Sequence, residues 1–223
     1  MRVSPSQAPP SISVATDALL KRWLLEFVQT PGLTAVTELG EAHALHVVDA
    51  LTALPLLLPG TLVDVGSGGG SPGLPLAAHR PGHRTTLLES NQKKSEFMRR
   101  WAGHFGTVSV VCERAEEYAA GAAFEQFDNA TARALAPPAV ALEWALPLVR
   151  TGGRFVLYTT RSNESAVAAV APLVGGHLRE SVSPYSDSDR ILCVIEKAVD
   201  TPAGFPRRVG IARKRPLTPP RNA

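Results

Sequence analysis

Cysteine is scarce in this sequence of 223 residues, which contains only Cys112 and Cys193. Two sulfurs without ligand-spaced partners argue against a disulfide framework or a metal site, and we expect both in the core of a protein from a reducing cytoplasm. Long hydrophobic runs are also missing, so no segment approaches the roughly 20 apolar residues of a membrane helix. Residues 1–14 lack the hydrophobic centre of a signal peptide, and their proline and serine predict a disordered leader.

Acidic residues are absent from residues 201–223, which hold six of the 23 lysines and arginines. The net charge of the whole chain is only +3, so its basic character is concentrated in this tail. Such a tail is typical of a segment that binds a polyanion, although a solubilising terminus has the same composition. A second basic cluster, around Lys93 and Lys94, falls in an expected helix. Two interpretations are open for it, a surface that binds a polyanion and a solvated helix face.

The length and the 44% content of hydrophobic residues predict one sizeable domain with extensions at both ends. Apolar residues recur at helical spacing over 16–29 and 41–57, which predicts two helices before the main domain. The expected organisation is a disordered leader over 1–15, a helical extension over 16–58, a cofactor-binding domain over 59–200 and a basic tail over 201–223.

From residue 61 onward, short apolar runs alternate with helical patterns, as in a doubly wound parallel sheet. The expected strands are 61–65, 84–88, 107–112, 128–131 and 154–159, and the expected helices are 73–79, 91–105, 138–148 and 163–174. Two final apolar runs, 178–184 and 191–198, are too close together for an intervening helix and must form an antiparallel hairpin. The predicted class is α/β, with a mostly parallel sheet, an antiparallel C-terminal strand and an N-terminal helical extension.

The strand over 61–65 runs into a glycine-rich turn, Asp64-Val-Gly-Ser-Gly-Gly-Gly-Ser-Pro-Gly-Leu74. Glycine permits close approach of a ligand and a positive φ, and the following helix offers free N–H donors. Glu89 closes the next expected strand, at the spacing of a ribose-binding acid. These features together predict a site for a nucleotide-like cofactor.

Two cofactors fit this pattern. Gly68-x-Gly70-x-x-Gly73 matches the dinucleotide fingerprint, which keeps NAD open. Asp64, in contrast, would repel a phosphate but suits the cationic amino-acid end of S-adenosylmethionine (SAM). The terminal hairpin also favours the Rossmann-like class I fold of SAM-dependent methyltransferases, because a dinucleotide dehydrogenase normally continues with further crossover helices.

Further motifs occur in a characteristic order between about residues 33 and 217. They are Leu33-Thr34, His46-x-x-Asp49, the glycine turn, Leu87-Leu-Glu-Ser90, Lys93-Lys94, Arg114-Ala-Glu-Glu117, Phe127-Asp128, Arg133-Ala134, Glu143-Trp144, Phe205-Pro-Arg-Arg208 and Arg215-Pro-Leu217. Together they resemble the bacterial 16S rRNA guanine-N7 methyltransferases known as RsmG or glucose-inhibited division protein B. The resemblance implies SAM as donor and 16S rRNA or the small ribosomal subunit as acceptor. We also expect a monomer.

The resemblance implies a set of cofactor-binding residues at the ends of successive strands. They are Asp64, Gly66, Ser67, Gly68, Gly70, Leu74, Glu89, Ser90, Ala115, Glu116 and Arg133. Asp64 and the glycine backbone would hold the methionine end, and Glu89 would accept hydrogen bonds from the ribose hydroxyls. Ala115 and Glu116 would flank adenine. Asp128 is expected near the cofactor edge, with a strand-end acid as the alternative.

The expected catalytic residue is Arg133, which follows the fourth strand and would contact the substrate or its phosphate, unless it forms a structural salt bridge. His46 and Asp49 share a helix face, where they form a hydrogen-bonded pair or line the RNA entrance. The substrate-binding residues expected are His46, Lys93, Lys94, Arg161, Arg207 and Arg208. No metal is expected. Attack by N7 of guanine releases no proton from that nitrogen, so catalysis needs positioning and electrostatics and no general base.

The sequence departs from the family pattern at three places on the expected acceptor side. Gly32 stands where asparagine is usual, Ala132 where serine is usual, and Thr159-Thr160 where lysine and glycine are common. Arg161 would replace the lysine charge only in part, because the two cations differ in geometry. The alternatives left open are a SAM-dependent methyltransferase of another substrate, an NAD-dependent oxidoreductase and a non-catalytic RNA-binding module.

Overall fold

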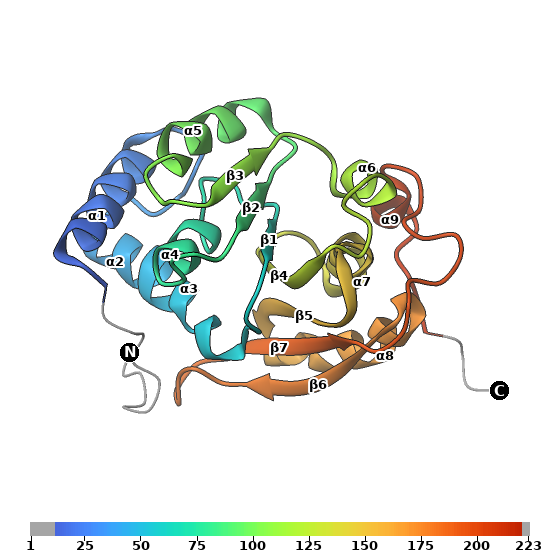
Figure 1. Cartoon of the computed structure of the whole chain (residues 1–223). Coiled ribbons are helices and arrows are strands. Elements are labelled where there is room, and N and C mark those ends of the chain that lie inside the picture. Colours follow the sequence, from blue (N-terminus) through green and yellow to red (C-terminus); the bar gives the residue numbers. More distant parts are fainter. Residues whose placement is uncertain (1–11, 220–223) are drawn as a thin grey trace.

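A computed structural model of the protein describes residues 12–219 (Figure 1). The expected leader therefore lies mostly outside the described residues. No helix within 12–219 is long and apolar enough to cross a membrane. In the same range, His, Cys, Asp and Glu side chains form no group of three or more that could hold a metal ion.

A seven-stranded sheet forms the centre of the molecule, in the order β3-β2-β1-β4-β5-β7-β6. The strands are β1 (Leu62–Val65), β2 (Thr85–Leu88), β3 (Val108–Val111), β4 (Phe127–Arg133), β5 (Val149–Thr160), β6 (Gly176–Val182) and β7 (Arg190–Lys197). The first five pair in parallel, and β7 runs antiparallel to both β5 and β6. The predicted mostly parallel sheet with an antiparallel hairpin is confirmed.

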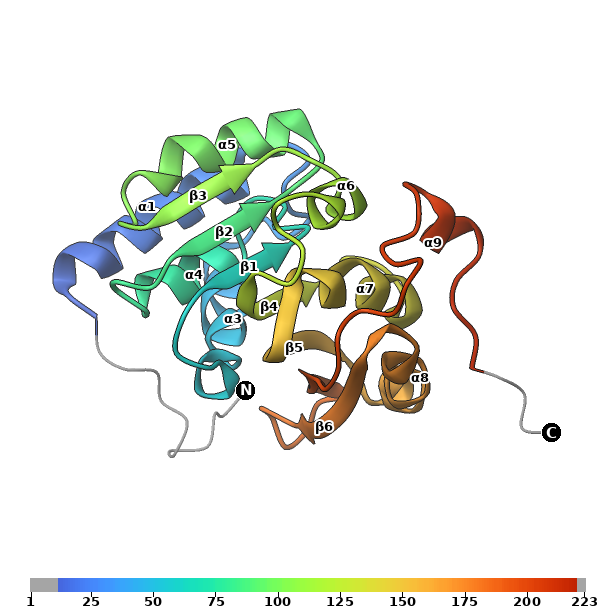
Figure 2. The ribbon, with the colours of Figure 1, turned by 45° about the vertical axis from the view of Figure 1, so that its right-hand side comes forward.

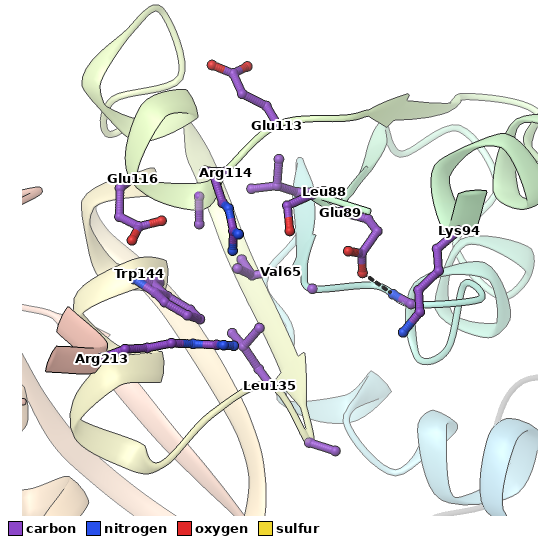
Figure 3. Close-up of a pocket in the computed structure, with 15 residues that line it drawn as sticks. Val65, Leu88, Glu89, Lys94, Glu113, Arg114, Glu116, Leu135, Trp144 and Arg213 are labelled. Atoms are coloured by element: carbon purple, nitrogen blue, oxygen red, sulfur yellow. Dashed lines mark hydrogen bonds between the residues drawn. The ribbon is translucent and has the colours of Figure 1, made fainter. Parts of the chain in front are cut away.

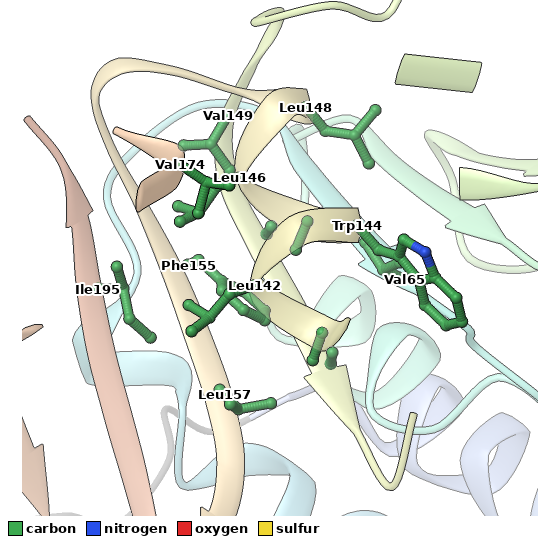
Figure 4. Close-up of a cluster of buried hydrophobic side chains, with 14 of the residues drawn as sticks. Val65, Leu142, Trp144, Leu146, Leu148, Val149, Phe155, Leu157, Val174 and Ile195 are labelled. Atoms are coloured by element: carbon green, nitrogen blue, oxygen red, sulfur yellow. The ribbon is translucent and has the colours of Figure 1, made fainter. Parts of the chain in front are cut away.

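Helices cover both faces of this sheet (Figures 1 and 2). One layer contains α1 (Val14–Gln29), α2 (Leu39–His43), α3 (Asp49–Leu51), α4 (Gly73–Ala78) and α5 (Gln92–Ala102), and the other contains α6 (Ala115–Ala120), α7 (Pro138–Ala145), α8 (Glu164–Val170) and α9 (Ile211–Lys214). Alternate residues of each strand point to opposite layers. Val63 and Val65 join the cluster beneath α7 (Figure 4), whereas Leu62 joins the cluster beneath α1.

Three segments differ from the sequence-based expectation. The helix expected over 41–57 is divided, because a π-helical turn, Ala44–Val48, separates α2 from α3 and a 3₁₀ turn follows at Leu54–Leu56. Helix α6 was not predicted. Cys112 is exposed, in contrast to the buried Cys193, because it lies just past the end of edge strand β3.

The basic tail is folded over residues 201–219, which are its described part. Ala212 of α9 is fully buried, and Phe205 and Leu217 pack against the core beneath α7. The segment 205–217, called the C-terminal segment below, therefore belongs to the packed domain.

Candidate cofactor and acceptor sites

A cavity of about 220 Å³ lies at the carboxyl ends of β1 and β2 (Figure 3). Its lining residues come from the glycine turn, the segments after β2, β3 and β4, and helices α7 and α9: Val65, Gly66, Gly68, Leu88, Glu89, Ser90, Lys94, Glu113, Arg114, Ala115, Glu116, Ala134, Leu135, Trp144 and Arg213. Ligands of open parallel sheets bind at this edge, where the strand order reverses on either side of β1. We call it the cofactor cavity.

Glu89 fixes the glycine turn through a direct hydrogen bond. Its Oε2 accepts a hydrogen bond from the backbone N–H of Gly68 at 3.0 Å (Figure 3). Its Oε1 accepts one from Asn91 N at 2.8 Å. Gly68 has φ +59°, and a Cβ on it would meet open space. The turn therefore leaves room for a ligand, and the remaining lone pairs of Glu89 can accept hydrogen bonds from ligand hydroxyls.

Asp64 lies beneath the glycine turn, and its carboxylate is buried away from the cavity. Oδ1 accepts a hydrogen bond from Thr131 Oγ1 at 2.9 Å, and Oδ2 accepts one from Gly73 N at 3.1 Å. Burial raises the pKa of Asp64 to about 6, although these hydrogen bonds oppose the shift. The direct contact with a cationic ligand expected from the sequence is not available in this geometry. Asp64 holds the turn in place instead.

Helix α1 supports the turn from the opposite side. Trp23 Nε1 donates a hydrogen bond to the carbonyl of Gly69 at 3.0 Å. A Cβ on Gly69 would lie 2.0 Å from the Phe27 ring, so only glycine fits against this helix. The N-terminal helical layer thus fixes the shape of the cofactor cavity.

The expected cofactor residues separate into two groups. Gly66, Gly68, Glu89, Ser90, Ala115 and Glu116 line the cofactor cavity. Asp64, Ser67, Gly70, Leu74 and Arg133 do not line it; the Ser67 hydroxyl, for example, donates to the backbone carbonyl of Asp64 at 2.7 Å. Ser67 and Gly70 belong to the turn itself, while Asp64 and Arg133 bind it through Gly73 N and Ser71 Oγ.

Sequence reasoning missed the wall made by Leu135, Trp144 and Arg213. Trp144 belongs to a recognised motif, but its position opposite the glycine turn depends on how α7 packs. The wall adds apolar surface beside Val65, Leu88 and Ala115. A carboxylate for ribose, a glycine turn and apolar walls for a purine fit SAM.

A second cavity, of about 430 Å³, adjoins the first. Ala134 and Leu135 line both cavities, and Ala134 has a left-handed φ of +52° in the shared wall. The remaining lining residues come from the last residues of β4 and β5, from the segments that follow these strands, and from the first residue of β7: Arg133, Ala136, Pro137, Pro138, Leu157, Tyr158, Thr159, Thr160, Asn163 and Arg190. We call it the acceptor cavity.

Arg133 is tied to the protein through both terminal nitrogens. Nη1 donates to the carbonyl of Leu45 and, at 3.2 Å, to Asp49 Oδ2. Nη2 donates to His46 Nδ1 at 2.9 Å and to Ser71 Oγ at 2.7 Å. Its four terminal N–H groups are therefore engaged. This supports the alternative that Arg133 forms a structural salt bridge.

His46 is held as a neutral imidazole. Because the Arg133 guanidinium can only donate, Nδ1 accepts and Nε2 carries the proton, which it donates to Thr34 Oγ1 at 3.0 Å. Burial and the nearby positive charge of Arg133 lower the pKa of His46 to about 4. His46 and Asp49 do share a helix face, and both contact Arg133 rather than lining the acceptor cavity.

Arg190 was not singled out from the sequence. It begins β7, and because β7 is antiparallel, its first residue lies beside Thr160 at the carboxyl edge of the parallel strands. Arg190 Nη1 pairs with Asp49 Oδ2, but its side chain remains 30% exposed, against 10% for Arg133. Within residues 12–219, Nε and Nη2 of Arg190 have no hydrogen-bond partner, so Arg190 presents donors to the acceptor cavity.

The other expected substrate residues lie in several places. Lys94 lines the cofactor cavity, whereas Lys93 is exposed on α5. Arg161 is exposed and donates to Ser183 Oγ at 2.6 Å. Arg207 is bound by Glu143 through two hydrogen bonds, so its charge is already paired, and Arg208 is exposed.

Asp128 does not lie near the cofactor edge, and that expectation is wrong. It stands at the amino end of β4, on the edge of the sheet opposite to both cavities. Its carboxylate accepts hydrogen bonds from Thr61 N at 2.7 Å and from Arg150 Nε at 2.8 Å. The alternative of a strand-end acid fits this position.

Solved structures show the same fold at low sequence identity. A Burkholderia thailandensis 1,6-didemethyltoxoflavin-N1-methyltransferase, solved with S-adenosylhomocysteine (SAH) bound, has a TM-score of 0.55 at 16% identity and covers 88% of this chain and 95% of its own. The Methanococcus jannaschii fibrillarin pre-rRNA processing protein has a TM-score of 0.53 at 12% identity and covers 65% of this chain and 70% of its own. These likenesses show the fold alone.

Closer relatives are found by sequence. The chain is 35% identical over 210 residues to a ribosomal RNA small subunit methyltransferase G of Alkaliphilus metalliredigens, covering 87% of this chain and 86% of the relative. It is 39% identical over 182 residues to the protein of that name from Syntrophomonas wolfei, covering 77% and 85%. Residues 18–185 match the family model for GidB, described as rRNA small subunit methyltransferase G. The chain belongs to this methyltransferase family.

Proposed function

We propose that this protein transfers the methyl group of SAM to N7 of a guanine in 16S rRNA. The observation that carries the proposal is the pair of adjoining cavities, which share Ala134 and Leu135 at the carboxyl edge of the sheet. Bound in the first cavity, SAM supplies a methyl group made electrophilic by its sulfonium. The acceptor is naked 16S rRNA or the small subunit, in the cytoplasm, and the enzyme acts as a monomer.

Residues of the cofactor cavity have distinct tasks in this proposal. Glu89 accepts hydrogen bonds from the ribose hydroxyls while it holds Gly68 N, so one side chain binds ligand and shapes the turn. Leu88, Ala115 and Leu135 exclude water from the purine. Asp64 contributes through the turn, by holding Gly73 N from below.

The acceptor cavity receives the guanine in this proposal. Pro137, Pro138 and Tyr158 give it flat, partly apolar walls, and Arg190 provides donors for the base edge or the adjoining phosphate. Arg190 also supplies a cation beside Thr160, close to where family members often carry lysine. No general base is needed, so the chain acts by holding N7 in line with the methyl group.

Each segment of the chain has its own part in forming the two cavities in this proposal. The helical extension over 16–58 supports the glycine turn and contributes His46 and Asp49 to the Arg133 network. Residues 59–200 supply most of both cavities. The tail over 201–223 reaches the cofactor cavity through Arg213.

Calorimetry tests the cofactor assignment. We expect the purified protein to bind SAM and SAH but not NAD. Glu89→Ala is expected to weaken SAH binding by about 1.5–3 kcal/mol, because charge-assisted hydrogen bonds to ribose are lost. Glu96→Ala, which removes an exposed acid on α5, is the matched control and should bind as the wild type does. Binding of NAD, or equal affinity of Glu89→Ala and wild type, would contradict the assignment.

A further inference from the structure

The C-terminal segment contributes Arg213 to the wall of the cofactor cavity (Figure 3), and its helix α9 lies beside α7 (Figure 2). Arg207 pairs with Glu143 of α7, whose side chain is only 1% exposed. The N–H of Gly210 donates to Glu116 Oε1 at 3.1 Å, and Glu116 itself lines the cavity. These contacts fasten the segment to both α6 and α7.

Arg213 extends from α9 into the cofactor cavity. Its guanidinium carbon lies 5.1 Å from the centre of the Trp144 ring, and both side chains line the cavity. Figure 3 shows Arg213 reaching past Trp144 toward Leu135. Within residues 12–219, no carboxylate lies within ion-pair distance of Arg213, so an aromatic ring positions the guanidinium without neutralising it.

The position of Arg213 identifies the part of the ligand that it would meet. The glycine turn lies at β1, and Glu89, which suits ribose, lies just past β2. Arg213 lies on the opposite wall with Trp144 and near Glu116, whose segment follows β3. The moiety bound beyond the ribose, away from the glycine turn, is the purine. A planar guanidinium stacks on aromatic rings and is weakly hydrated, so it suits a purine face.

We propose that Arg213 is a cofactor-binding residue that contacts the purine ring of SAM, and that the C-terminal segment is a wall of the cofactor cavity. This inference rests on the proposed function, since it assumes that SAM occupies this cavity. Arg213 is exposed, as are its neighbours Lys214 and Arg215, but of the three only Arg213 lines the cavity. Within one basic stretch, one cation therefore serves the cofactor and its two neighbours do not.

Calorimetric titration of the full-length protein with SAH and with adenosine tests the inference. Arg213→Ala is expected to weaken both ligands by the same factor of about ten, because both contain the purine. Lys214→Ala, which removes an adjacent exposed cation from the same helix, is the matched control and should bind both ligands as the wild type does. Arg213→Lys keeps the charge and much of the side chain but loses the planar group, and it should bind about threefold to fivefold more weakly than wild type.

Wild-type affinity of both Arg213 variants would overturn the inference while leaving the SAM assignment intact. A loss confined to SAH would place Arg213 at the homocysteine end and overturn the purine contact. If Arg213→Ala does not fold, Arg213→Lys decides: wild-type affinity in that variant overturns the stacking contact. Failure of the wild-type protein itself to bind SAH would overturn the proposed function and the inference together. The wild-type titration thus distinguishes the two failures.

Discussion

The two arginines that contact Asp49 differ in their capacity to bind a ligand. Arg133 uses both terminal nitrogens on the protein, whereas Arg190 binds the described part of the chain through Nη1 alone and offers its other donors to the acceptor cavity. The sequence indicated Arg133 because it follows the fourth strand. The sequence did not show that Leu45, His46 and Ser71 would surround it, because those contacts join segments distant in the chain.

Arg133→Ala is expected to lower the free energy of unfolding by about 3 kcal/mol, because it removes a buried partner of Asp49. Urea unfolding measures this change. Arg150→Ala, which breaks the more exposed pair with Asp128, should cost at most about 1 kcal/mol. An unchanged free energy of unfolding in Arg133→Ala, with a large loss of methylation rate, would instead make Arg133 a substrate contact.

His46 should make the stability depend on pH. Its pKa is about 4 in the folded protein and near 6.5 when unfolded, so below pH 6.5 the unfolded state binds the proton first. Stability is therefore lost as the pH falls from 6.5 to 4. Between pH 7.5 and pH 5, the titration of His46 alone lowers the free energy of unfolding by about 2 kcal/mol. Asp64, with a raised pKa, acts in the opposite direction over part of this range.

His46→Gln isolates the histidine, because glutamine retains an acceptor and a donor but does not titrate. We expect this variant to lose about 2 kcal/mol less than wild type between pH 7.5 and pH 5, measured by urea unfolding. The contribution of Asp64 is common to both proteins and cancels in the difference. Parallel stability curves for the two proteins would show that His46 titrates normally in the fold.

At the scale of elements, two segments outside the parallel core shape the cofactor cavity. Helix α1 contacts the glycine turn through Trp23 and Phe27, and the C-terminal segment supplies Arg213. The sequence predicted α1 from its apolar spacing. The sequence indicated a tail for the basic segment because of its composition. Composition alone does not show that Ala212 is buried or that Arg207 pairs with Glu143.

Gly69→Ala tests the support from α1. The added methyl would lie 2.0 Å from the Phe27 ring, so the turn or the helix must shift. We expect a loss of about 1–3 kcal/mol in the free energy of unfolding, together with weaker SAH binding. Gly103→Ala is the control, because its Cβ meets nothing within 4 Å. Equal behaviour of the two variants would show that the turn does not depend on this contact.

Arg207→Ala tests the anchor of the C-terminal segment. It leaves the Glu143 carboxylate buried without its cation, which is expected to cost about 3 kcal/mol of stability. SAH affinity should fall as well, because α9 loses an attachment beside the cavity. Arg208→Ala, at an exposed neighbour, should change neither quantity. If Arg207→Ala instead weakens only RNA binding, the segment is an RNA-binding tail as its composition first suggested.

At the scale of the whole molecule, the alternation of apolar runs predicted the sheet and its terminal hairpin. The short link between 178–184 and 191–198 allowed only an antiparallel pair, and β6 and β7 are so arranged. The division of the helix expected over 41–57 and the placement of Asp128 were not predictable in the same way. Both depend on packing between distant segments, whereas α6, Ala115–Ala120, has good helix formers and was detectable in principle.

The most direct test of the account is in vitro methylation of 16S rRNA. Small subunits and naked 16S rRNA from cells that lack this protein are incubated with the purified enzyme and labelled SAM, and N7-methylguanine is mapped. We expect label at N7 of one guanine with wild type and Lys214→Ala, and at least tenfold slower labelling with Glu89→Ala. Label at another atom, in another RNA, or in no RNA would contradict the central claim.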